Sequence, residues 1–262
     1  MDNKMENLSY TEINAKTIDS WVEDGWEWGT PVTPEVCQKA LEGEWDVLLS
    51  PTRPVPHKWF LPFEGSKLLG LASGGGQQMP IFSILGAKCT LLDLSDRQLE
   101  SDRMVAKREG YEIEIIKADM TKRFPFEDET FDQIFHPVSN CYIEDVYHVW
   151  RECYRVLKPG GVLLSGLGNE ANYIFEEDAT ELRIDNIMPF NPLKNPEQMA
   201  KLDTWDGVQF SHSFDEQIGG QLKAGFVLTD AYMDWNEVPY GTGCPISAAG
   251  IAAFWVTKAV KL

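Results

Sequence analysis

The sequence predicts an α/β fold with a doubly wound, mostly parallel, seven-stranded sheet. Three observations support this prediction. From Lys67 onward, short apolar segments alternate with segments of helical periodicity, as expected for a parallel sheet that helices cover on both faces. The first apolar segment ends in the glycine-rich turn Ser73-Gly74-Gly75-Gly76. No helical segment separates the last two apolar segments, so we expect an antiparallel C-terminal strand.

Residues 1–65 are predicted to be an N-terminal cap segment that wraps irregularly over the core. The segment is rich in proline and tryptophan, and its tryptophans are Trp21, Trp26, Trp28, Trp45 and Trp59. One helix is expected within it, from residue 34 to residue 42. Thr33 can cap this helix, and Pro34 suits its first position.

The seven strands are expected where apolar segments stand between turns and helices. They cover residues 67–72, 89–94, 113–117, 131–135, 162–167, 226–232 and 251–259. Helices are expected from the glycine-rich turn to about residue 85, over 95–109 and over 144–157. Ser95 and Gln98 have the spacing of a capping box, and Gly110 is a typical helix stop.

The periodic pattern is lost after residue 168, and residues 169–212 are predicted to be an insertion after the fifth strand. Ser213 and Glu216 repeat the capping-box spacing and predict a helix that ends near residue 224. We therefore divide the chain into the cap segment and one domain, residues 66–262, which contains the insertion.

The charge of the chain narrows the class of its partners. Lys and Arg number 23 against 41 Asp and Glu, a formal charge of −18. No window concentrates basic residues, which argues against nucleic acid and anionic membranes as partners. No apolar run approaches the ~20 residues that span a bilayer. The cysteines are odd in number and form no CxxC pair (Cys37, Cys89, Cys141, Cys153 and Cys244). This usage favours reduced thiols, no metal site and a cytoplasmic location.

Three predicted strands end in residues suited to binding a nucleoside. In open parallel sheets, ligands bind beyond the carboxyl ends of the strands. Gly74 allows the backbone to approach a ligand closely, and Asp93 is placed to accept the two ribose hydroxyls of an adenosine. Asp119 follows the third strand and converges on the same edge.

This pattern is compatible with a nicotinamide or a sulfonium cofactor. The dinucleotide fingerprint GxGxxG has its third glycine where a small residue lets the helix pack closely on the strand. This chain has Met79 at that position. The sequence therefore favours a sulfonium cofactor. A nicotinamide-dependent oxidoreductase is the alternative.

Four stretches resemble the class I S-adenosylmethionine-dependent methyltransferases, particularly the small-molecule group related to the ubiquinone and menaquinone methyltransferases. The resemblance covers about residues 65–168. It rests on LLGLASGGG at residues 68–76, LDLS with QL at 92–99, ADM with FPF and FDQI at 118–134, and RVLKPGG at 155–161. The family's first motif is acid-x-Gly-x-Gly-x-Gly, whereas this chain has Gly70 in the acid position and Ala72 in the first glycine position.

The resemblance implies a Rossmann-like methyltransferase fold, S-adenosyl-L-methionine as cofactor and a set of residues that bind it. Asp93 would bind the ribose diol, Asp119 the adenine amino group, and Met120 would pack on the ring. The cofactor-binding set is Ala72, Ser73, Gly74, Gly76, Asp93, Leu94, Gln98, Asp119, Met120 and His136. The segment that holds Asn140 and Tyr142 would border the acceptor.

Methyl transfer from a sulfonium is an in-line displacement that depends mainly on alignment and on exclusion of water. A general base is needed only if the acceptor must lose a proton. His136 is the candidate for that role, because a near-neutral pKa suits it; the alternative is a histidine that hydrogen-bonds the backbone at the strand end. We expect a small, neutral or cationic acceptor, and keep a non-catalytic cofactor-binding protein as a further hypothesis.

Overall fold

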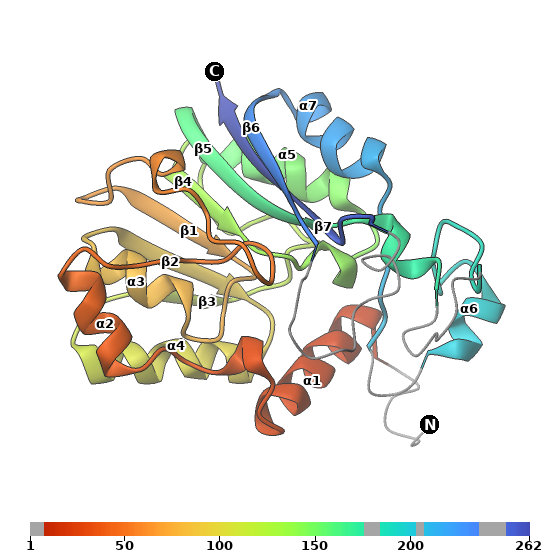
Figure 1. Ribbon diagram of the computed structural model, residues 1–262, viewed down its shortest axis with the longest axis horizontal. Helices are drawn as coiled ribbons and strands as arrows, with labels where there is room; N and C mark the ends of the chain where they lie inside the picture. Colours follow the sequence, from red (N-terminus) through yellow and green to blue (C-terminus); the bar gives the residue numbers. More distant parts are fainter. Residues whose placement is uncertain (1–7, 176–183, 203–206, 236–249) are drawn as a thin grey trace.

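The computed structural model describes residues 8–175, 184–202, 207–235 and 250–262. Its strands form one seven-stranded sheet in the order β3-β2-β1-β4-β5-β7-β6 (Figure 1). The strands are β1 Lys67–Leu71, β2 Lys88–Asp93, β3 Glu114–Lys117, β4 Phe131–His136, β5 Leu157–Gly168, β6 Phe226–Asp234 and β7 Phe254–Lys261. The longer helices are α1 Tyr10–Glu23, α2 Pro34–Leu41, α3 Gln78–Ile84, α4 Asp96–Glu109 and α5 Val146–Val156; α6 Pro196–Lys201 and α7 Gly220–Ala224 are short.

The directions of the strands confirm the predicted fold class. β1 pairs in parallel with both β2 and β4, β2 with β3, and β4 with β5. β7 lies antiparallel between β5 and β6. The strand order reverses between β1 and β4, and this switch point is where an open α/β sheet forms its ligand crevice.

Side chains alternate between the two faces of the sheet and build two apolar layers. Leu68 of β1 packs in a layer with side chains of α2, α3, α4 and the N-terminal segment. Leu69 points to the other face, into a layer built largely by α5. The layers explain why the strands read as continuous apolar runs: both faces are buried.

Helix α1 corrects the prediction of an irregular cap with a single helix. The segment indeed contains α2, close to its predicted bounds, but residues 10–23 form a further helix. Ser9 and Glu12 form a capping box in which each side chain bonds the backbone N–H of the other residue. The buried residues of α1 are polar (Thr11, Asn14 and Thr17), so the apolar periodicity that identifies most helices is weak here.

The other differences concern where elements begin and end. β5 starts at Leu157 and runs through the expected helix stop Lys158-Pro159-Gly160-Gly161. The capping box of Ser213 and Glu216 forms as predicted, but it opens a π-helical turn, Asp215–Gly219, before α7. β7 begins at Phe254, three residues later than expected.

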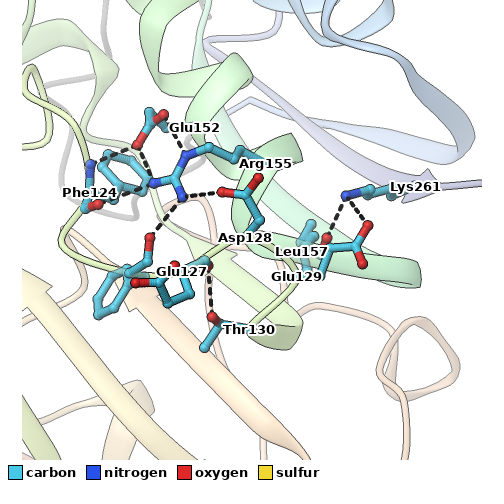
Figure 2. Close-up of polar contacts among 10 residues, drawn as sticks. Phe124, Glu127, Asp128, Glu129, Thr130, Glu152, Arg155, Leu157 and Lys261 are labelled. Atoms are coloured by element: carbon cyan, nitrogen blue, oxygen red, sulfur yellow. Dashed lines mark hydrogen bonds and ion pairs between the residues drawn. The ribbon is translucent and has the colours of Figure 1, made fainter.

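The RVLKPGG stretch has a structural role that Figure 2 makes visible. The Arg155 guanidinium donates hydrogen bonds to the carbonyls of Phe124 and Phe126 and to the carboxylates of Asp128 and Glu152. Glu152 in turn accepts the Phe124 N–H at 2.7 Å. Because these groups come from α5 and from the loop before β4, the network fixes that loop against the helix.

Candidate functional site

A cavity of about 250 Å³ opens beyond the carboxyl ends of β1, β2 and β3, the edge that the sequence predicted. Its floor comes from the turns that follow these strands. Its remaining walls come from α1, the segments around residues 26–28 and 48–51, the loop after β4 and the start of β7. The cavity therefore gathers residues from both ends of the chain.

The glycine-rich turn after β1 is packed tightly against the next strand and helix. Ala72, Gly75 and Gly76 have positive φ angles. A Cβ on Gly74 would lie 2.6 Å from the Gln98 Cβ and 3.0 Å from Asp93 Oδ2. Only glycine allows this approach, so the turn presents bare backbone to the cavity.

Asp93 is buried at the end of β2 and lines the cavity. Its Oδ2 accepts the Gly74 N–H and its Oδ1 accepts the Ser95 N–H, each at 3.0 Å. Burial raises the pKa of this carboxyl, and the backbone hydrogen bonds oppose the rise. These bonds also orient the carboxylate, whose remaining lone pairs can accept hydroxyl groups.

Asp119 follows β3 and lies on the same cavity. Its Oδ1 accepts the Thr121 N–H at 2.8 Å, and its Oδ2 accepts a hydrogen bond from Thr11 Oγ1 of α1 at 3.1 Å. Met120, which is buried beside it, adds an apolar surface. The carboxylate and the apolar surface together suit a flat, polar-edged ring such as a nucleobase.

Helix α1 closes one side of the cavity through its polar face. Asn14 Nδ2 donates to the carbonyls of Tyr142 and Val208, both at 2.9 Å. Asp19 Oδ1 accepts from Ser95 Oγ at 2.6 Å and from the Arg97 N–H at 2.9 Å. A covering role fits the predicted N-terminal cap segment, but the helical form of this wall was not predicted, although the Ser9–Glu12 capping box is a signal that locates it.

Nine of the twelve residues predicted for the site line the cavity: Ala72, Ser73, Gly74, Asp93, Leu94, Gln98, Asp119, Met120 and Tyr142. The structure does not bring Gly76, His136 and Asn140 to the cavity wall. The Gly76 N–H bonds the Asp102 carboxylate on the far side of the turn, at 3.0 Å. Gly76 thus contributes to the shape of the turn through its bond to Asp102, without lining the cavity.

The His136 side chain points to the α5 face of the sheet, against Trp150, and is completely buried. Its Nδ1 hydrogen-bonds the Leu71 carbonyl at 2.9 Å and its Nε2 the Asn140 Oδ1 at 2.8 Å. Asn140 Nδ2 continues the chain to Gln217. Burial lowers the pKa of His136, against these hydrogen bonds. This geometry matches the backbone-bonding alternative: His136 does not line the cavity, whereas Ser139, whose Oγ lies 3.4 Å from the His136 Nδ1, does.

The position of the family's acid is filled by a neighbouring side chain. A Cβ on Gly70 would overlap the Met79 sulfur of α3. Met79 is fully buried, so β1 has no room for a carboxylate there. The polar side chains at this end of the cavity are neutral: Ser73 Oγ donates to Gln78 Oε1 at 3.4 Å, and both residues line the cavity.

The described residues also bear on metal sites, disulfides and membrane-spanning helices. Among them, no group of three or more His, Cys, Asp or Glu side chains is arranged to hold a metal ion. Cys37, Cys89, Cys141 and Cys153 are free thiols, and Cys244 lies outside the described residues. No described helix has both the length and the apolar character needed to cross a bilayer.

Comparison with known proteins points to one family. Residues 69–165 match the methyltransferase domain family. The uncharacterized methyltransferase YbaJ of Bacillus subtilis is 40% identical over 227 residues, which cover 84% of this chain and 89% of the relative. Methyltransferase phqN of Penicillium fellutanum is 28% identical over 239 residues, 82% of this chain and 69% of that protein.

The structural comparison agrees with the sequence matches. An S-adenosylmethionine-dependent methyltransferase from Mesorhizobium loti aligns with a TM-score of 0.60 over 78% of this chain and 94% of that one. At 20% identity, this likeness concerns the fold alone. The matches give no support to a nicotinamide-dependent oxidoreductase.

Proposed function

The chain belongs to the class I S-adenosylmethionine-dependent methyltransferases, and we propose that it transfers a methyl group from S-adenosylmethionine to a small-molecule acceptor in the cavity described above. The observation that supports this proposal most strongly is the joint presence of Gly74, Asp93 and Asp119 on one cavity. Each follows a different strand, and together they offer bare backbone and two carboxylates to a nucleoside.

The residues present fit this cofactor. Asp93, oriented by two backbone N–H groups, would accept hydrogen bonds from the two ribose hydroxyls. Asp119 would accept a hydrogen bond from the adenine amino group, in place of the one that its Oδ2 accepts from Thr11. Leu94 and Met120 would pack against the base, and Ser73 and Gln78 would hydrogen-bond the methionyl end in place of the absent acid.

When bound, the cofactor would supply a methyl group on a positively charged sulfur, so that the acceptor's electron pair would form the new bond and the carbon–sulfur pair would stay on sulfur. The protein's part is to align the acceptor and keep out water. Helix α1 and the indoles of Trp26 and Trp28 line the cavity above the strand ends and suit this role. Our proposal gives His136 no role as a general base, since both of its nitrogens are bonded within the protein.

The test is calorimetric binding of S-adenosylhomocysteine, the demethylated product, to wild-type protein and to Asp93→Ala. Loss of bonds to two ribose hydroxyls is expected to weaken binding about 100-fold. Asp96→Ala is the matched control: it lies three residues further on, its side chain is 65% exposed, and it pairs with Lys117 outside the cavity. Unchanged affinity in Asp93→Ala, with the fold intact by circular dichroism, would refute the site.

A second measurement separates an enzyme from a non-catalytic cofactor-binding protein. Incubation with methyl-labelled S-adenosylmethionine and a panel of small acceptors should transfer label to at least one acceptor class. Binding of the cofactor without label transfer to any member of a broad panel would favour the non-catalytic hypothesis.

A further inference from the structure

The part of the cavity beyond the proposed cofactor residues has walls of a distinctive chemistry. We call it the acceptor end, and it is lined by Leu48, Ser50, Pro51, Val138, Ser139 and Phe254. These residues come from the segment around residues 48–51, the loop after β4 and the start of β7, on the β5 side of the cavity. Four of the six are apolar and the other two carry uncharged hydroxyl groups, so an apolar body would bury surface against these walls.

Charge is confined to the other end. Among the described residues that line the cavity, the only members of the Asp, Glu, Lys, Arg and His types are Asp93 and Asp119, both at the carboxyl ends of the cofactor strands. From this distribution we propose that the methyl acceptor is an uncharged, predominantly apolar molecule. The proposal rests on the proposed function, because it takes Asp93 and Asp119 as ligands of the cofactor.

An anionic acceptor lacks a partner at this site. No lysine or arginine is among the described residues of the cavity wall, and an unpaired anion would lose its hydration without compensation. The formal charge of −18 also repels an anion before it reaches the cavity.

A cationic acceptor meets the opposite obstacle. It would have to stand beside the positively charged sulfur, and like charges at close range in a low-dielectric cavity repel strongly. The two carboxylates that could offset this repulsion already accept backbone and α1 hydrogen bonds at the adenosine end. Trp26 and Trp28 could attract a cation through their ring faces, but such contacts contribute only about 1–2 kcal/mol.

Three probes that share one aromatic body test the proposal: 2-naphthol, 2-naphthoate and 2-naphthylmethylammonium. Binding to protein saturated with S-adenosylmethionine, whose sulfur carries the positive charge, is measured by equilibrium dialysis at pH 7. The neutral probe is expected to bind about tenfold or more tightly than either ion, reflecting the cost of burying an unpaired charge. Equal or tighter binding of an ion, or retention of none of the three, would overturn the proposal.

A substitution at the acceptor end should reverse the preference. Val138 is half-buried, lines the cavity and uses only its backbone N–H in bonding the Leu49 carbonyl. Val138→Lys is expected to favour 2-naphthoate over 2-naphthol by about tenfold; Val138→Met adds length without charge and should keep the neutral preference. An unaltered preference in Val138→Lys would place the probes elsewhere and overturn the proposal.

The binding of S-adenosylhomocysteine, measured first by calorimetry, keeps the two proposals apart. If the protein binds it and then prefers a charged probe, the acceptor class is wrong and the methyltransferase assignment of the cavity stands. If S-adenosylhomocysteine does not bind, the proposed function fails, and the acceptor class with it.

Discussion

Replacing Asp102 by asparagine should stabilise the protein at neutral pH and leave its stability nearly unchanged near pH 4. Asp102 lies on α4 with no exposed surface, and its Oδ2 accepts the Gly76 N–H at 3.0 Å. Burial raises the pKa of this carboxyl to about 8, although the Gly76 hydrogen bond opposes the rise. At pH 7 the folded protein therefore holds this proton, whereas the unfolded chain has released it.

The sign and size of the effect follow from proton linkage. Between the unfolded pKa of about 3.9 and the folded pKa near 8, the native state binds one more proton than the unfolded state. The free energy of unfolding then falls by about 1.4 kcal/mol for each unit of pH. The contribution is fully present below the unfolded pKa and is lost as the pH rises to the folded pKa. Asparagine keeps an oxygen for the Gly76 N–H and does not ionise, so it removes this slope.

Urea unfolding of both proteins at pH 5, 6 and 7 measures the effect. The advantage of Asp102→Asn over wild type should grow by about 2–3 kcal/mol across this range. Asp102→Ala is the control at the same position: it removes the slope equally, but it loses the Gly76 bond and leaves a cavity, so it should be less stable than Asp102→Asn at every pH. Parallel pH profiles for wild type and Asp102→Asn would show an ionised native carboxyl and refute the reasoning.

Three further outcomes are expected. Arg155→Ala should lower the free energy of unfolding by about 3–5 kcal/mol in urea titrations, because it leaves the Glu152 carboxylate, only 11% exposed, without its cation. A loss below about 1 kcal/mol would contradict this prediction. Gly166→Ala should give no soluble folded protein, because the new Cβ would overlap a backbone carbonyl, whereas Gly168→Ala meets nothing within 4 Å and should express normally. Asp19→Ala removes a hydrogen-bond acceptor of α1 at the N-terminus of α4 and should lower the free energy of unfolding by about 1 kcal/mol. It should also make α1 more sensitive to proteolysis, and unchanged digestion would count against docking of α1 by this contact.

The central sheet was predictable because its signals are local. Each parallel strand is buried on both faces and is therefore an apolar run, and each is followed by a turn that glycine or a capping residue marks. The segments 67–72 and 131–135 match β1 and β4 to within one residue. Helix α1 lacks this signal, because the residues that it buries are Thr11, Asn14 and Thr17. The hydrogen-bond partners of Thr11 and Asn14 lie far along the chain.

The candidate site likewise has residues that the sequence could locate and residues that it could not. Asp93 and Asp119 could be located because each ends a strand, and the ends of parallel strands meet at one edge of the sheet. His136 also ends a strand, yet its side chain points to the α5 face, where it packs edge-on to Trp150 with ring centroids 6.0 Å apart. The end of a strand is visible in the sequence, whereas the direction of its last side chain depends on the register and twist of the sheet.

The departures at the glycine-rich turn form one consistent arrangement. Where the family has an acid on the first strand, this chain has Gly70, and Met79 of α3 fills the space. Two carboxyl groups still bond the turn, and they come from neighbouring elements: Asp93 of β2 accepts the Gly74 N–H, and Asp102 of α4 accepts the Gly76 N–H. Restoring the acid with Gly70→Asp would overpack the space that Met79 occupies and bury a further carboxyl group in the core. The turn that faces the proposed cofactor is therefore held by carboxyl groups of β2 and α4, with none on β1.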